Sequence, residues 1–206
     1  EQGACGPVRR RRSACWQASR WRAALGWGLL WSLFAVAATA KDGAIQCANL
    51  VYGGTHTSRC FSHEFLTSVQ RETAVGTERR FKSVKLGSDE LFRFPFVVMT
   101  GERDFTLTSR EREHLRRYLE SGGFVLASAG CSSKEWDKAF RRELGRVFGR
   151  ERDLEKMAAD HPIYRTYYRI GALELSHPGP AAYLEGIAVA DTTVLIYSRH
   201  GLNDTA

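Results

Sequence analysis

The residue best suited to nucleophilic chemistry is Cys131, which follows an apolar run and precedes a polar, helix-starting sequence. At such a strand–turn–helix elbow, unpaired backbone N–H groups and the helix dipole would lower the pKa of a thiol and could hold an oxyanion. A thiol nucleophile also needs a base. We expect His161 to be that base, oriented by Asp160 or Glu102. The alternative is that Cys131 is a small side chain filling a tight turn.

A second group of chemically capable residues is His56, Cys60 and His63. Imidazole and thiolate are ligands that suit zinc, so these three residues are candidates for a metal site. Alternatively, His63 helps to begin a helix, and Cys60 forms a disulfide with Cys47 that would remove its thiolate. The chain has neither G-x-G-x-x-G nor G-x-x-x-x-G-K-[ST], so we expect no nucleotide and predict no cofactor.

Several polar or glycine-containing turns follow the predicted strands. In open α/β sheets, ligands bind beyond the carboxyl ends of the strands, so these turns should form one rim. We therefore predict a ligand-binding rim at this end of the sheet. Its members are Gly53, Gly54, Gly101, Asp104, Gly130 and Ser132, followed after the last strand by Ser198-Arg199-His200.

Short apolar runs alternate with helical stripes along the chain, which predicts a mostly parallel sheet covered by helices. The expected strands span 45–52, 81–86, 94–99 and 124–129, and a helix is expected over about 62–74. Capping boxes at Thr108–Glu111 and Ser132–Glu135 should begin two further helices. Strands over 184–189 and 193–198 should form a C-terminal β-hairpin at one edge of the sheet.

The first forty residues have the order of a secretory signal peptide. Four consecutive arginines, Arg9–Arg12, precede an uncharged apolar run over 23–40 that ends in Ala38-Thr39-Ala40. The run is at the short end for a spanning helix, so we expect cleavage, with a retained membrane anchor as the alternative. We predict a periplasmic or extracellular protein with a single α/β domain over 41–206. The polar end Gly201–Ala206 closes no element and is consistent with a C-terminal truncation.

The formal net charge of +7 would by itself favour a nucleic-acid partner. Six arginines and one glutamate in residues 1–40 carry +5 of this charge, which leaves +2 for residues 41–206. That part has no basic stripe interleaved with stacking aromatics, so we expect no nucleic-acid partner. The expected partner is a small molecule or an envelope protein, with membrane contact only through an uncleaved signal segment.

Six motifs occur together in a fixed order. They are Phe94-Pro-Phe-Val-Val-Met-Thr-Gly101, Leu115-x-x-Tyr118-Leu119-x-x-Gly122-Gly123-Phe124, Cys131, Trp136-Asp137-x-x-Phe140-Arg141, Asp160-His161-Pro162-Ile163-Tyr164 and Gly201-Leu-Asn-Asp-Thr-Ala206. This set resembles a bacterial family catalogued as domain of unknown function 4159. The resemblance implies a three-layer, flavodoxin-like sheet with helices on both faces, similar to class I glutamine amidotransferase-like domains.

In that superfamily, a cysteine at a strand–helix elbow forms a triad with a histidine and an acidic residue, and Cys131 falls at the corresponding turn. The Gly-x-Cys-x-Gly pattern and the C-terminal His-x-Glu of active amidotransferases are absent from this chain. Our leading prediction is an exported, non-catalytic, ligand- or protein-binding domain. The alternatives are a cysteine-dependent hydrolase or amidotransferase-like enzyme using Cys131 and His161, and a small metal-binding domain using His56, Cys60 and His63.

Overall fold

The computed structural model describes residues 43–58, 63–149, 151–175 and 181–202. The predicted signal segment, Cys60 and the last four residues of the chain lie outside the described residues. Within the described part, no helix is both long enough and apolar enough to cross a membrane.

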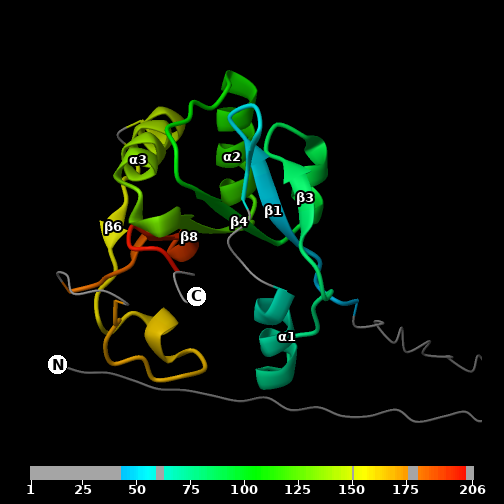
Figure 1. The fold of residues 1–206 in the computed structure, drawn as a ribbon, viewed down its shortest axis with the longest axis vertical. Helices are drawn as coiled ribbons and strands as arrows, with labels where there is room; N and C mark the ends of the chain where they lie inside the picture. The colour runs from blue at the N-terminus through cyan, green and yellow to red at the C-terminus, as the bar shows by residue number, and fades with distance from the viewer. Residues whose placement is uncertain (1–42, 59–62, 150, 176–180, 203–206) are drawn as a thin grey trace, which may run out of the picture. The chain divides into compact units, whose positions relative to one another are not determined.

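Five parallel strands make up the centre of one mixed, eight-stranded sheet (Figure 1). In spatial order they are β3 (Lys82–Lys85), β1 (Cys47–Tyr52), β4 (Phe96–Gly101), β5 (Phe124–Ala129) and β8 (Thr192–Ser198). Three antiparallel strands complete the sheet. They are β2 (His56–Thr57) beside the end of β1, β7 (Glu185–Val189) beside β8, and β6 (Glu155–Lys156) beside β7. The prediction of a mostly parallel α/β sheet is confirmed.

The C-terminal hairpin is also confirmed, since β7 and β8 pair antiparallel around the positive-φ residues Ala190 and Asp191. We expected the hairpin to form one edge of the sheet, but neither of its strands is the outermost strand, because β6 lies beyond β7. Strand β8 is an inner strand between β5 and β7, which suits its run of buried residues from Val194 to Ser198. The carboxyl end of β8 therefore reaches the same rim as the carboxyl end of β5.

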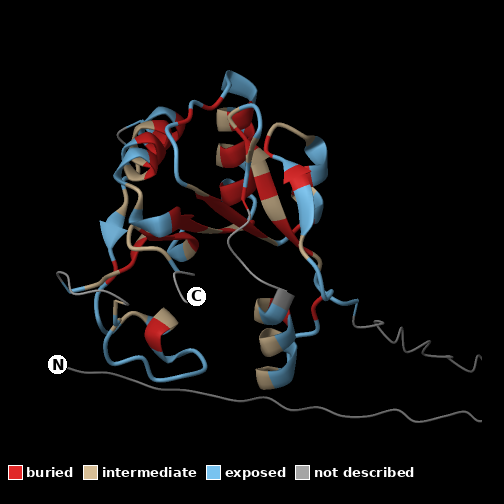
Figure 2. Cartoon of the chain, in the orientation of Figure 1, coloured by how far each residue is buried: buried red, intermediate tan, exposed pale blue. Residues whose placement is uncertain are grey.

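Helices α2 (Ser109–Glu120) and α3 (Lys134–Phe148) cover one face of the sheet and bury the main core (Figure 2). Leu115, Leu119 and Phe140 are among the helix side chains that pack with strand residues such as Leu50 and Met99. Helix α1 (His63–Glu72) and the 3-10 helix η3 (Pro162–Arg165) lie on the other side of the sheet (Figure 1). A smaller cluster of Met157, Tyr164, Leu184 and Ile196 forms there.

One predicted capping box is confirmed and the other is wrong. Thr108 and Glu111 make both hydrogen bonds of a capping box at the start of α2. Helix α3 is capped by Ser133, whose hydroxyl accepts from Trp136 N, and not by Ser132. The reason is that Ser132 has a left-handed backbone (φ 54°) and belongs to the preceding turn, whereas a capping residue needs the extended backbone that Ser133 has.

A buried hydrogen-bond chain joins α3 to the two strands β1 and β4. Trp136 Nε1 donates to Tyr52 Oη at 2.7 Å, and Tyr52 Oη donates to the carbonyl of Thr100 at 2.8 Å. Both rings pass directly over Gly101, where an added Cβ would lie 2.5 Å from Tyr52 Oη and 2.6 Å from Trp136 Nε1. Only glycine allows this approach, because the bulk of the two rings already fills the space of a side chain.

We expect Gly101→Ala to lower the free energy of unfolding by about 2–3 kcal/mol, the cost of overpacking a filled core. Gly145→Ala is the matched control, because Gly145 is an exposed position in α3 where a Cβ meets nothing within 4 Å. This control should raise stability by about 0.5–1 kcal/mol. Urea unfolding followed by circular dichroism measures both changes. Equal effects of the two substitutions would contradict the close approach at Gly101.

Candidate functional site

The turn after β5 contains the clearest backbone strain at the predicted rim. Cys131 has φ 46° and ψ 35°, and Ser132 has φ 54°, so two consecutive non-glycine residues adopt the left-handed conformation. Each such residue costs about 1–2 kcal/mol. Strain of this kind persists only where surrounding contacts enforce it, and it concentrates at functional sites. Cys131 is exposed at this turn.

Hydrogen bonds to residues that follow β4 and β8 hold the turn in place. Ser132 Oγ donates to the carbonyl of His200 at 2.9 Å, and Ser133 Oγ donates to the carbonyl of Glu102. Cys131 Sγ donates to Glu102 Oε1 at 3.4 Å. Gly130 leaves room for this contact, because a Cβ there would lie 3.0 Å from Glu102 Cγ. The structure thus brings together the predicted rim residues that follow β4, β5 and β8.

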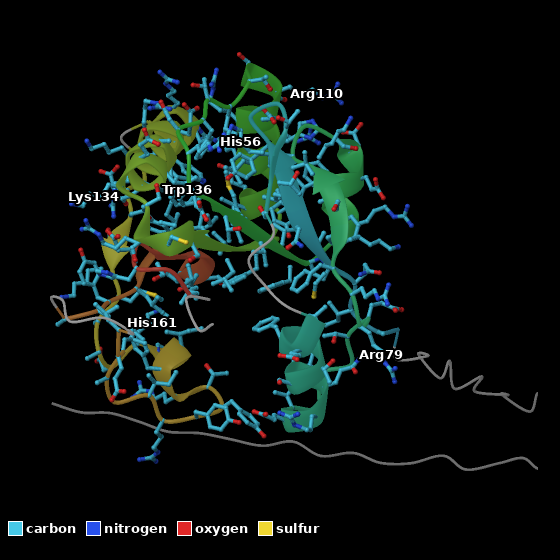
Figure 3. All side chains as sticks on the ribbon, in the orientation of Figure 1. His56, Arg79, Arg110, Lys134, Trp136 and His161 are labelled. Carbon is cyan, nitrogen blue, oxygen red and sulfur yellow. The ribbon has the colours of Figure 1, made fainter. Side chains whose placement is uncertain are left out.

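His161 does not lie beside Cys131. Its Nδ1 accepts from Ile163 N at 3.2 Å, and its Nε2 lies 3.2 Å from Thr193 Oγ1. Thr193 is at the amino end of β8, whereas Ser198 at the carboxyl end pairs with Ser128 just before the Cys131 turn. Five residues of strand span about 16 Å. Figure 3 shows His161 on the side of the sheet away from Trp136 and α3.

The sequence around His161 explains its position. Pro162 occupies the first turn of η3, where its fixed φ and missing N–H are tolerated, and His161 is the residue that caps this 3-10 helix. The predicted pair of Cys131 and His161, with Asp160 as its orienting acid, is therefore not formed. Glu102, the other predicted orienting acid, contacts the sulfur of Cys131 directly.

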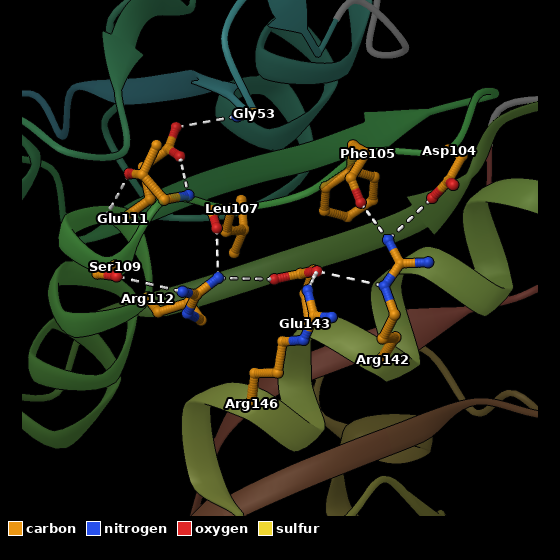
Figure 4. A network of polar contacts seen from close by, with 11 residues as sticks. Gly53, Asp104, Phe105, Leu107, Ser109, Glu111, Arg112, Arg142, Glu143 and Arg146 are labelled. Atoms are coloured by element: carbon orange, nitrogen blue, oxygen red, sulfur yellow. Dashed lines mark hydrogen bonds and ion pairs between the residues drawn. The ribbon is translucent and has the colours of Figure 1, made fainter.

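The turn after β1 differs from its predicted role. Gly53 and Gly54 have positive φ, as expected for a tight turn, but Gly53 N donates to Glu111 Oε1 at 2.9 Å. The other oxygen of Glu111 accepts from Thr108 N at 2.7 Å (Figure 4). Glu111 is only 8% exposed. The Gly53 N–H group, which could have bound an anion, is thus occupied by a carboxylate of the protein itself. Gly53 is therefore not available to bind a ligand at the rim.

Asp104 also has a structural partner. Arg142 contacts Asp104 at 2.9 Å, and this hydrogen bond lowers the pKa of the Asp104 carboxyl group. Arg142 also contacts Glu143, which is 1% exposed and which Arg112 and Arg146 approach as well (Figure 4). A buried carboxylate is stabilised by such cations. We conclude that Asp104 helps to fasten the loop after β4 to α3.

The predicted metal ligands are only partly described. The ring of His56 stacks on Tyr52 with centroids 5.7 Å apart and also faces Phe105. Cys60 and the side chain of His63 lie outside the described residues. No group of three or more histidine, cysteine, aspartate or glutamate residues within the described ranges is placed to hold a metal ion. Cys47 is a buried, free thiol, and its burial raises its pKa.

His200 is the described histidine that reaches the rim after β8. Its carbonyl accepts from Ser132, while its ring packs edge-on against Tyr183 with centroids 6.0 Å apart. Burial, and then the positive charge of Arg199, lower the pKa of His200 below its ordinary value of 6.5. Its Nε2 is buried and has no hydrogen-bond partner among the described groups. Burial therefore favours the neutral form of this imidazole.

The sequence model of one protein family matches residues 46–204, from the start of β1 to beyond the end of β8. The chain belongs to the family described as domain of unknown function (DUF4159). The match includes every rim residue discussed above, so the strained turn and its contacts lie within the DUF4159 domain itself. A search of curated proteins found no match to the chain.

Two features of this DUF4159 domain were missed by reasoning from sequence. Ser133 joins the helix start to Glu102, but the capping-box spacing pointed to Ser132 instead. Lys156 and Tyr183 meet across β6 and the segment before β7, with Lys156 Nζ 4.7 Å from the ring centroid. No spacing rule could have found this second pair, because its members lie 27 positions apart in the sequence.

We expect the His200 ring to titrate below pH 6.5 in NMR spectra of the folded chain, with His200→Gln identifying its signals. Because the folded pKa is lowered, the unfolded chain binds this proton more tightly. The contribution of His200 to stability is thus complete above pH 6.5 and is lost as the pH falls through the folded pKa. His200→Gln should weaken the loss of stability between pH 7.5 and 5. A pKa at or above 6.5 would contradict the burial of this ring.

Proposed function

We propose that this DUF4159 chain is a non-catalytic, ligand- or protein-binding domain of the bacterial envelope. Its binding surface would be the rim formed by Glu102, Cys131, Ser132 and Ser133. The observation that carries the proposal is the contact of Glu102 Oε1 with Cys131 Sγ inside a strained, exposed turn. The strain supports a functional role for this turn, and the contact favours binding over catalysis.

A carboxylate beside a thiol opposes nucleophilic catalysis. A thiolate at Cys131 would face the like charge of Glu102 at 3.4 Å, which disfavours the reactive form. The start of α3 acts in the opposite sense, but a helix terminus carries only about half a unit charge. The full negative charge of Glu102, in direct contact with the sulfur, should outweigh the partial positive charge at the start of α3. The rim then offers acceptor oxygens and a weak S–H donor, which favours a ligand that presents N–H or O–H groups.

We also infer a flavodoxin-like sheet. Counted along the chain, the five parallel strands lie in the order 2-1-3-4-5, the order of flavodoxin-like folds. This order supports the kinship with class I glutamine amidotransferase-like domains. In such sheets the usual ligand crevice lies between the first and third strands, here β1 and β4. Glu111 and Phe105 occupy that place, which supports a binding surface shifted towards β5 and β8.

The alkylation rate of Cys131 separates binding from catalysis. We expect iodoacetamide at pH 8 to modify Cys131 in the full chain no faster than it modifies glutathione, with the site identified by mass spectrometry. Glu102→Gln should accelerate the reaction about fivefold, the effect of removing one adjacent charge in a solvated setting. Glu113→Gln is the matched control, because this exposed acid lies in α2, outside the loop that carries Glu102. Cys131→Ser gives the background of the other cysteines.

The second candidate function is a cysteine-dependent hydrolase or amidotransferase-like enzyme. It is favoured by the position of Cys131, an exposed and strained residue between a buried strand and a helix start. Alkylation of the unaltered chain a hundredfold faster than glutathione would make this candidate the leading one. The same result would reject the non-catalytic proposal, because such a rate requires an activated thiolate.

Export is the remaining part of the proposal, supported by the basic, apolar and small-residue order of residues 1–40. When a bacterium produces the chain with a start methionine, we expect a periplasmic or secreted protein whose N-terminal sequence begins Lys41-Asp42. Ala40→Arg should block cleavage and leave the longer form attached to the membrane. Recovery of the uncleaved, unaltered chain from the cytoplasm would reject export.

A further inference from the structure

A hollow lies beside the outer strand β6, and Tyr183 in its wall contacts Arg199 and His200 of the predicted rim. It has a volume of about 370 Å³ and is bordered by β6, by the segment that follows η3 and by the residues that lead into β7. Met157, Tyr164, Ile170 and Leu173 supply most of its apolar side chains. Met157 and Tyr164 belong to the smaller core cluster, so the base of the hollow is continuous with packed structure.

Lys156 is the only lysine among the described residues that line this hollow. Its Nζ lies 4.7 Å from the centroid of the Tyr183 ring, which also forms part of the wall. Cation–π contact of this kind holds an ammonium group in place without neutralising it. Lys156 makes no ion pair with any carboxylate in the described part of the chain.

The acid opposite Lys156 in the sheet already pairs with another residue. Glu185 is the cross-strand neighbour of Lys156, but both of its oxygens bind Arg141, at 3.0 and 2.5 Å. A second cation, Arg199, lies 3.5 Å from the hydroxyl of Tyr183. The Tyr183 side of the hollow thus carries positive charge that the neighbouring acid does not balance.

We propose that this hollow binds a small carboxylate with an apolar body, such as a medium-chain acyl acid or a single-ring aromatic acid. The carboxylate would meet Lys156, and the apolar body would cover Met157, Tyr164 and Leu173. The volume is at the small end of the range for small-molecule sites, which excludes long-chain lipids as complete occupants. This proposal does not depend on the function proposed for Glu102, Cys131, Ser132 and Ser133.

The experiment measures the binding of octanoate to the full chain by isothermal titration calorimetry. The control ligand is 1-octanol, which has the same chain length but carries no charge. We expect octanoate to bind and Lys156→Gln to weaken this binding about tenfold, the effect of losing one charge-assisted contact. The affinity for 1-octanol should not change. Lys138→Gln is the control, since this exposed lysine of α3 undergoes the same change of charge on the other face. Ala182→Phe, which fills the hollow, should abolish binding of both compounds.

Three results would overturn the proposal. They are the absence of octanoate binding at millimolar concentration, equal affinity of the unaltered chain for octanoate and 1-octanol, and equal weakening by Lys156→Gln and Lys138→Gln. Lys156 is exposed, so its substitution tests the charge contact even if Ala182→Phe fails to fold. Alkylation of Cys131 is a separate readout, so failure here leaves the proposal for the rim unaffected.

Discussion

The hydrogen bond from Trp136 to Tyr52 is the constraint on which the arrangement of the rim depends. It fixes the first turn of α3 against β1, and the Tyr52 hydroxyl in turn donates a hydrogen bond to the Thr100 carbonyl at the end of β4. The two rings leave no room for a side chain at Gly101. The chain therefore leaves β4 in one direction, and this direction carries Glu102 to the turn that contains Cys131.

Carboxylates of the protein occupy positions where a ligand anion would be expected in a sheet of this kind. Glu111 binds the Gly53 amide, and Glu102 approaches the strained turn at the start of α3. Glu143 is enclosed by arginine side chains between α2 and α3. The protein's own carboxylates therefore supply the negative charge that a ligand anion would otherwise bring to the carboxyl end of the sheet. A ligand of this rim should therefore supply donors rather than compete as an anion.

Local sequence signals were sufficient for most of the fold but not for the site. Periodicity located the main helices and the parallel strands, and the Thr108–Glu111 spacing correctly predicted a capping box. The partner of Cys131 could not be predicted in the same way, because it depends on how the chain leaves β4 and β5. His161 appeared suitable by residue type, yet Pro162 fixes it as the cap of a short helix at the opposite end of β8. The sequence indicated which side chains could do chemistry, but it did not predict which turns, far apart in the chain, lie next to one another in the fold.

The inner position of β8 has a consequence for the order in which the domain is assembled. Pairing of Ser128 with Ser198 joins residues 70 positions apart, and β7 in turn depends on β8 for its place in the sheet. Contacts between such distant residues form late, because the intervening chain must be closed before they are gained. During synthesis, β5 therefore keeps one edge open until residues 192–198 have emerged. Until then the nascent chain exposes the backbone groups of a central strand, and a chaperone that covers strand edges would act at this stage.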